Sequence, residues 1–184
     1  MQRIAYVDGE FGPLAEASVS IEDRGFLFGD GVYDVVRLVE GAYFRLDRHI
    51  ERLLDNARSL EFGGLPAADK LVQIADRLRE RSDLVDGMLY MQLTRGSGVR
   101  QSQFPSESDP TVVLYIDKMR RSADKFRDEG VEVLLVPEIR WRRCDVKSVN
   151  LLPKVMMKQR AVEQDCYEAV FVGGDGTVWE GTST

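Results

Sequence analysis

Two helical stretches, each with a single apolar stripe, constrain the fold of the first part of the chain. Residues 48–60 carry apolar side chains at helical spacing, and Asp47 precedes them as an expected N-cap. The stripe consists of Ile50, Leu53, Leu54, Ala57 and Leu60. A second stripe follows the break at residues 63–66 and predicts a helix that ends near Arg81. Each apolar face needs another layer of structure to cover it.

Apolar runs of strand length flank these two helices. The first ends in a tight turn at Asp8-Gly9, and the second continues through Glu40-Gly41 into a hairpin. The predicted strands are residues 4–7, 32–39, 42–46, 88–94 and 111–116. We therefore expect residues 1–117 to form an N-terminal domain with an antiparallel sheet and two helices.

The rest of the chain is predicted to start a second domain. Residues 118–121 are expected to be a linker, and residues 122–184 the beginning of a C-terminal domain. Its predicted elements are a helix at 123–129 ending on Gly130, a strand at 131–136, a helix from an Asn150 cap to about 164, and a hairpin of 167–172 with 177–179. The sequence stops directly after a strand, so we expect this domain to be incomplete and the protein to be longer. The predicted class is a two-domain α/β (α+β) fold.

Composition argues against several classes of function. The net charge of −6 and the pI near 5.0 argue against a nucleic-acid partner, because phosphate binding needs a basic surface. No apolar run is long enough to predict a membrane span. A single histidine argues against both a Ser-His-Asp triad and a multi-histidine metal site, so no metal is expected. Cys144 and Cys166 lack disulfide-framework spacing, which favours a reducing cytoplasm.

A lysine in an apolar frame is the most unusual residue of the chain. Lys147 stands between Val146 and Val149, in the stretch of residues 143–152 that joins an apolar run to a helix start. Lysines are usually solvated, so this stretch alone favours a surface residue. Four other segments change that interpretation, namely Arg24-Gly-Phe-Leu-Phe-Gly-Asp-Gly-Val-Tyr33, His49-Ile-Glu-Arg-Leu53, Thr94-Arg-Gly-Ser-Gly-Val-Arg100 and Glu180-Gly-Thr-Ser-Thr184.

In this order and spacing, the five segments resemble the fold-type IV pyridoxal-phosphate (PLP) enzymes, and among them the D-amino-acid aminotransferases. The resemblance extends from Tyr6 to the last residue. It implies a PLP-dependent transfer of an amino group from an amino acid, expected to be of D configuration such as D-alanine, to a 2-oxo acid. It also implies a homodimer, and a cofactor held in the cleft between the two domains.

The resemblance assigns the cofactor to residues of both domains. Lys147, expected in the second domain, would hold PLP as a Schiff base and then move the proton from the substrate Cα. Glu180 would keep the pyridine nitrogen protonated, and Arg52 would bind the phosphate. Thr182 and Ser183 would add hydroxyl contacts on the phosphate side. We interpret His49, on the same predicted helix as Arg52, as a structural histidine.

The resemblance assigns the substrate carboxylate to Tyr33 and Arg100. In D-amino-acid aminotransferases the corresponding arginine lies on a loop that enters the partner subunit's site, and a histidine follows it two positions later. Here that position is Ser102, although the Gln103-Phe-Pro105 that follows agrees with the family. The departure concerns the substrate pocket rather than the cofactor site.

Three alternatives remain open at this point. A branched-chain aminotransferase would use the same cofactor residues on L-amino acids. An aminodeoxychorismate lyase carries an Arg-Gly-x-Gly stretch like Arg95-Gly-Ser-Gly98, but the Gly-Tyr pair expected after Arg100 is missing. A protein that holds the cofactor without catalysis is the third alternative.

Overall fold

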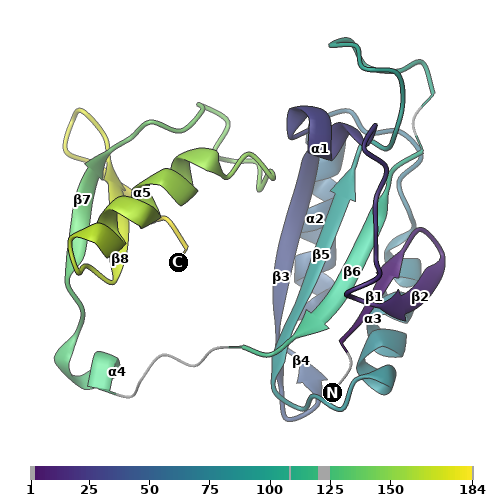
Figure 1. Cartoon of the computed structure of the whole chain (residues 1–184), viewed down its shortest axis with the longest axis horizontal. Coiled ribbons are helices and arrows are strands. Elements are labelled where there is room, and N and C mark those ends of the chain that lie inside the picture. Colours follow the sequence, from purple (N-terminus) through teal and green to yellow (C-terminus); the bar gives the residue numbers. More distant parts are fainter. Residues whose placement is uncertain (1–2, 108, 120–124, 184) are drawn as a thin grey trace. The chain divides into compact units, whose positions relative to one another are not determined.

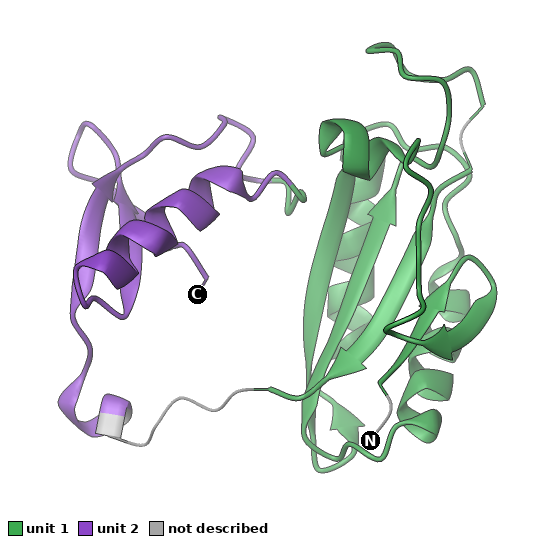
Figure 2. Cartoon of the chain, viewed as in Figure 1, with its two compact units in different colours: residues 1–119, 146–149 green, residues 120–145, 150–184 purple. Residues whose placement is uncertain are grey.

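The computed structural model describes residues 3–107, 109–119 and 125–183, whose helices and strands are drawn in Figure 1. The chain divides into two compact units, coloured green and purple in Figure 2. Unit 1 consists of residues 1–119 and 146–149, and unit 2 of residues 120–145 and 150–184. Each unit has a hydrophobic core of its own. The predicted mixture of helices and strands is confirmed.

Unit 1 contains a six-stranded antiparallel sheet in the order β2-β1-β6-β5-β3-β4. The strands are β1 (Ile4–Val7), β2 (Glu10–Pro13), β3 (Gly31–Val39), β4 (Ala42–Tyr43), β5 (Gly87–Thr94) and β6 (Val112–Asp117). Glu40 and Gly41 both have positive φ, as a two-residue hairpin turn requires. The predicted strands are present, but β4 ends at Tyr43 rather than Leu46 because a helix begins at Leu46.

Helices α2 (Leu46–Ser59) and α3 (Ala68–Arg81) cover one face of this sheet (Figure 1). The predicted stripes are buried, apart from Leu60, which is half-buried. They pack on alternate strand residues such as Val36 and Leu89, which gives unit 1 its core. The predicted cap was wrong. The N-cap is Arg45, with φ of 56° and no side-chain cap bond, and Asp47 lies in the first turn because the helix begins earlier than expected.

A short helix, α1 (Arg24–Phe28), was not predicted. The side chain of Asp23 caps it by accepting a hydrogen bond from the Gly25 amide at 2.8 Å, and Gly29 ends it with φ of 68°. Five residues are too few to show a helical period in the sequence. The available signal was the pairing of an aspartate cap with a glycine stop.

Unit 2 contains a three-stranded sheet in the order β7-β8-β9. Its elements are α4 (Lys125–Glu129), β7 (Val133–Pro137), α5 (Leu152–Glu163), β8 (Glu168–Val172) and β9 (Val178–Gly181). Strands β7 and β8 are parallel, and α5 forms the crossover between them. Phe171 and Ala161 lie at the centre of its small core.

These elements agree with the prediction, with one correction at a helix start. The N-cap of α5 is Leu151 without a side-chain cap bond, so Asn150 is not the cap. Residues 123 and 124 of the predicted first helix, and residues 120 and 121 of the predicted linker, lie outside the described residues.

The chain returns to unit 1 for four residues, 146–149. The Tyr33 amide donates to the carbonyl of Lys147 at 3.0 Å, and the Val149 amide donates to the carbonyl of Gly31 at 3.0 Å. These bonds extend the free edge of β3, and Val146 enters the core of unit 1. Lys147 therefore groups with unit 1, in contrast to the expectation that it belongs to the second domain.

Candidate active site

Lys147 is fixed at the edge of β3 through its backbone and half-buried through its side chain. Its amide donates to Oδ1 of Asn56 at 3.3 Å, and its carbonyl accepts from Tyr33. The ammonium Nζ lies 4.5 Å from the centroid of the Tyr33 ring. The structure thus brings together two of the predicted site residues, and Asn56 is a supporting residue that the sequence did not reveal.

Next to Tyr33, a fully buried carboxylate holds two side chains of α2. Oδ2 of Asp34 accepts from Nε of Arg52 at 2.7 Å, and Oδ1 accepts from Nη2 at 2.8 Å. Nδ1 of His49 lies 2.8 Å from Oδ1. An ionised carboxylate only accepts hydrogen bonds, so the Nδ1–H of His49 is the donor in this contact. The Arg52 side chain remains 53% exposed, which presents a rigidly held guanidinium at the surface.

The charge state of this cluster follows from its contacts. Burial raises the pKa of Asp34, but hydrogen bonds from Arg52 and His49 more than offset burial and lower that pKa below its ordinary value. The hydrogen bond to Asp34 raises the pKa of Arg52. Asp34 was missed by the sequence analysis, although a carboxylate inside an apolar strand run was a usable signal. It stands at a position of β3 that faces the helices.

Tyr33 points to the other face of the sheet, because side chains alternate along β3. Its ring stacks on Tyr90 at 5.7 Å, and Tyr90 stacks on Tyr115 at 5.0 Å. Burial raises the pKa of Tyr90, so its phenol is neutral at physiological pH. A row of aromatic rings therefore crosses three strands and ends at Lys147.

Arg100 and Ser102 are exposed on the loop that follows β5. The Arg100 guanidinium lies 5.5 Å from the centroid of the Phe28 ring. Among the described residues, no contact joins either side chain to Lys147 or Arg52. Their predicted part in substrate binding stays a prediction.

In unit 2, Glu180 is held between two cations. It forms ion pairs with Arg140 and, at 3.1 Å, with Nζ of Lys154. Arg140 is itself held by Glu138, whose hydrogen bond raises the Arg140 pKa, and by the Phe171 ring at 4.6 Å. Sequence reasoning gave Arg140 and Lys154 no part in the site, and no local pattern marks them.

Thr182 and Ser183 are turned toward a buried carboxylate. Both hydroxyls and both amides donate to Glu168, which is 3% exposed. Burial raises the pKa of Glu168, but the hydrogen bonds from Ser183 and Thr182 outweigh burial and lower it. In this arrangement the two hydroxyls fix the end of β9, and their predicted contact with a phosphate is untested.

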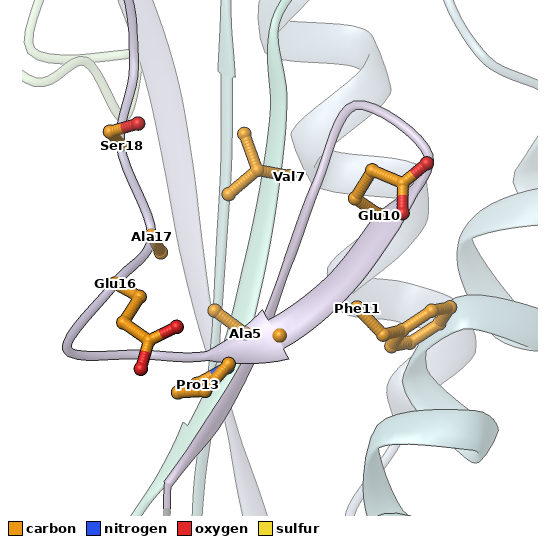
Figure 3. A pocket seen from close by; sticks show the side chains of 9 residues that line it. Ala5, Val7, Glu10, Phe11, Pro13, Glu16, Ala17 and Ser18 are labelled. Atoms are coloured by element: carbon orange, nitrogen blue, oxygen red, sulfur yellow. The ribbon is translucent and has the colours of Figure 1, made fainter.

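A cavity of about 370 Å³ lies at the β1–β2 hairpin of unit 1 (Figure 3). Its lining includes Ala5, Val7, Pro13, Glu10 and Glu16. None of the predicted site residues lines it. Within the described residues, no group of histidine, cysteine and acidic side chains could hold a metal ion, and no helix is long and apolar enough to cross a membrane.

Comparison with known proteins points to one family. Residues 31–184 match the family described as amino-transferase class IV. The chain is 39% identical over 180 residues to a D-alanine aminotransferase of Bacillus licheniformis, with 96% of this chain and 62% of the relative covered. It thus spans less than two thirds of that relative's length.

Two solved structures share the fold. The branched-chain amino acid aminotransferase of Escherichia coli superposes with a TM-score of 0.87 at 16% identity, over 99% of this chain and 63% of the other. A hypothetical aminotransferase of Mycobacterium tuberculosis, in a PLP-bound form, gives a TM-score of 0.83 at 20% identity, over 97% and 65%. At such identities these likenesses describe the fold alone.

Proposed function

The chain belongs to the amino-transferase class IV family, and from this premise we propose that it forms part of a PLP-dependent aminotransferase. The proposed reaction moves an amino group from an amino acid, of D configuration such as D-alanine, to a 2-oxo acid. The observation that carries the proposal is the lysine Nζ over the Tyr33 ring at the edge of β3, the strand whose Asp34 holds Arg52. The name of the Bacillus licheniformis relative supports the D-amino acid substrate.

The chemistry of the donor set fits PLP. Lys147 supplies a primary amine, and Arg52 supplies a guanidinium whose exposed side can bind phosphate oxygens while Nε and Nη2 stay on Asp34. Glu180 supplies the carboxylate for the ring nitrogen. PLP, when bound, provides an electron sink for the charge that develops at the substrate Cα. Thr182 and Ser183 would join the phosphate side only in competition with Glu168.

Different residues of the chain take different roles in the proposed reaction. Lys147 would move the proton from the donor Cα to the cofactor C4′ and, in the second half of the reaction, from C4′ to the acceptor Cα, as a general base and acid. Glu180 would keep a proton on the ring nitrogen, and the ion pairs with Arg140 and Lys154 hold its carboxylate in place. Tyr33 and Arg100 bind the substrate carboxylate, and Ser102, which is shorter than histidine, makes that pocket looser.

We also propose a homodimer in which the loop of residues 96–105 crosses the interface, because Arg100 is exposed on this loop and its one ring contact is with Phe28 among the described residues. A cytoplasmic location is proposed from the two free cysteines, Cys144 and Cys166.

Borohydride reduction in the presence of PLP tests the cofactor assignment. The label is expected on the peptide that contains Lys147, and Lys147→Ala should abolish it. Lys154→Ala is the matched control, since Lys154 is also a partly buried lysine beside a predicted site residue. Labelling of Lys154 or Lys158 in the unaltered protein would overturn the assignment.

The substrate is tested by adding D-alanine, L-leucine and aminodeoxychorismate separately to the PLP-loaded protein and following the cofactor absorption. Conversion by D-alanine is the expected result. Conversion by L-leucine alone would favour the branched-chain alternative, and release of a product from aminodeoxychorismate without an acceptor would favour the lyase.

A further inference from the structure

The segment Asp23–Asp30 builds a buried polar unit that the proposed reaction does not use. Asp23 and Arg24 of this segment are at most 4% exposed. Thr94 and Arg95, which pack against the segment from the end of β5, are equally buried. Buried charges are costly unless each is paired, so a unit of this kind has a definite structural task. Its contacts show that the task is to hold the loop that carries Arg100.

Arg24 connects α1 to that loop. Its Nε donates to Oδ2 of Asp30 at 2.9 Å, and its Nη1 donates to the carbonyl of Gln101 at 2.8 Å. Gln101 directly follows Arg100 in the chain. The guanidinium of Arg24 lies 4.7 Å from the centroid of the Phe28 ring, and that of Arg100 lies 5.5 Å from the same centroid. Arg24 thus fixes the backbone next to Arg100, and Phe28 gives both guanidinium groups a common surface.

The base of the loop is fixed by a second buried arginine. Arg95 donates to Oδ2 of Asp30 at 2.7 Å and to the carbonyls of Leu60 and Glu61 at 2.7 and 3.0 Å. Its guanidinium lies 4.4 Å from the Phe62 ring centroid and 3.7 Å from that of Phe104. Since Phe104 belongs to the loop itself, Arg95 holds the loop at its far end as well.

The backbone adds a third set of constraints. The Arg24 amide donates to the carbonyl of Gly96 at 2.9 Å, and the Gly98 amide donates to the carbonyl of Glu22 at 3.2 Å. Gly96 has φ of 89°, and a Cβ atom there would lie 2.1 Å from the carbonyl oxygen of Asp109, so only glycine fits. The loop is therefore held on both sides by contacts within unit 1.

We propose that Arg24 is a positioning residue that holds Arg100 in the geometry with which it binds the substrate carboxylate. The inference rests on the proposed function, because the task of Arg100 does. A loop that is already ordered loses less conformational entropy when its arginine binds a ligand. Lysine cannot replace Arg24, because a single ammonium lacks the planar fork that reaches Asp30 and the Gln101 carbonyl together.

The first test is a double-mutant cycle with Arg24→Lys and Arg100→Ala, measured with D-alanine. Arg24→Lys is expected to raise KM about tenfold with kcat unchanged, which is the effect of losing one charge-assisted hydrogen bond. In the Arg100→Ala background, Arg24→Lys should change KM less than twofold. Arg58→Lys is the matched control, because Arg58 is an exposed arginine paired with Asp55 at 2.7 Å. A full Arg24 effect that persists without Arg100 would overturn the proposal.

The second test does not depend on catalysis. Hydrogen–deuterium exchange over residues 96–104 should become faster in Arg24→Lys and stay unchanged in Arg58→Lys. If Arg24→Lys does not fold, Phe28→Leu removes the shared ring without breaking an ion pair, and should speed exchange to a smaller extent. Unchanged exchange in the loop would overturn the proposal. Faster exchange in a protein without transaminase activity would keep the loop anchor and reject the proposed function.

Discussion

Unit 1 and unit 2 each hold an acidic side chain against an arginine, but they expose these acidic side chains to water very differently. The Asp34 side chain is 0% exposed, under a helix that packs on a six-stranded sheet. The Glu180 side chain is 40% exposed, at the end of a three-stranded sheet. Geometry in the first cluster is imposed by the core around it, whereas geometry in the second depends on ion pairs that water and salt can weaken.

The largest expected effect comes from breaking the buried cluster. Arg52→Met leaves the Asp34 carboxylate buried with His49 as its remaining side-chain donor. An uncompensated buried charge is costly, so the free energy of unfolding should fall by about 3 kcal/mol. Denaturant titration at pH 7 measures it. Arg58→Met, which breaks the exposed pair with Asp55, is the control and should change it by less than about 0.5 kcal/mol. Equal effects of the two changes would show that burial does not distinguish these pairs.

The second expected effect is a dependence on pH that originates in Asp34. Its pKa in the folded protein lies below the ordinary value of 3.8, so its stabilising contribution is fully present above that value. The contribution is lost as the pH falls through the folded pKa, because the unfolded chain then binds the proton more tightly. The free energy of unfolding should therefore decrease below about pH 4. Asp34→Asn should make this decrease shallower at a cost of about 1–2 kcal/mol at pH 7.

If the free energy of unfolding of the Asp34→Asn protein falls below about pH 4 as steeply as that of the unaltered protein, another group causes the sensitivity to acid. Glu168 is the next candidate. Its pKa is also lowered by hydrogen bonds in a buried position, in unit 2. Glu168→Gln in the same background separates the two contributions, because these carboxylates belong to different units.

The same contrast explains how much could be predicted from the sequence. Most strands and helices of both units followed from apolar periods, because those periods report which side chains the core buries, but the short α1 and β2 did not. The N-caps were predicted less well than the helices themselves. Asp47 and Asn150 are favourable cap residues, but the path of the backbone into α2 and α5 makes Arg45 and Leu151 the N-caps. The return of residues 146–149 to the edge of β3 is a pairing between distant segments, which no local pattern encodes.

Some residues of the candidate site were predicted from the sequence, and others were missed. Lys147 and Tyr33 were singled out through motifs, and the structure places the lysine Nζ over the tyrosine ring. The residues that hold the site, such as Asp34, Asn56 and Arg140, were missed because their significance lies in partners far away in the sequence. A buried acidic residue in an apolar strand is the one signal of this kind that a reader of the sequence can use.

The smallest expected effect concerns the exposed cluster, and it completes the comparison. Lys154→Met removes one of the two cations from Glu180 and leaves Arg140 in place. Because Glu180 is partly solvated, the free energy of unfolding should fall by less than about 1 kcal/mol at low salt. Most of that loss of unfolding free energy should vanish at 0.5 M salt, where the screening length is roughly 4 Å.

The loss caused by Arg52→Met should persist at the same salt concentration, since bulk ions do not reach the Asp34 carboxylate. Denaturant titrations of both variants at low and high salt measure the difference, with Arg58→Met again as the exposed reference. If salt reduces the two losses in the same proportion, the exposure of the carboxylates does not govern how the two units hold their charges.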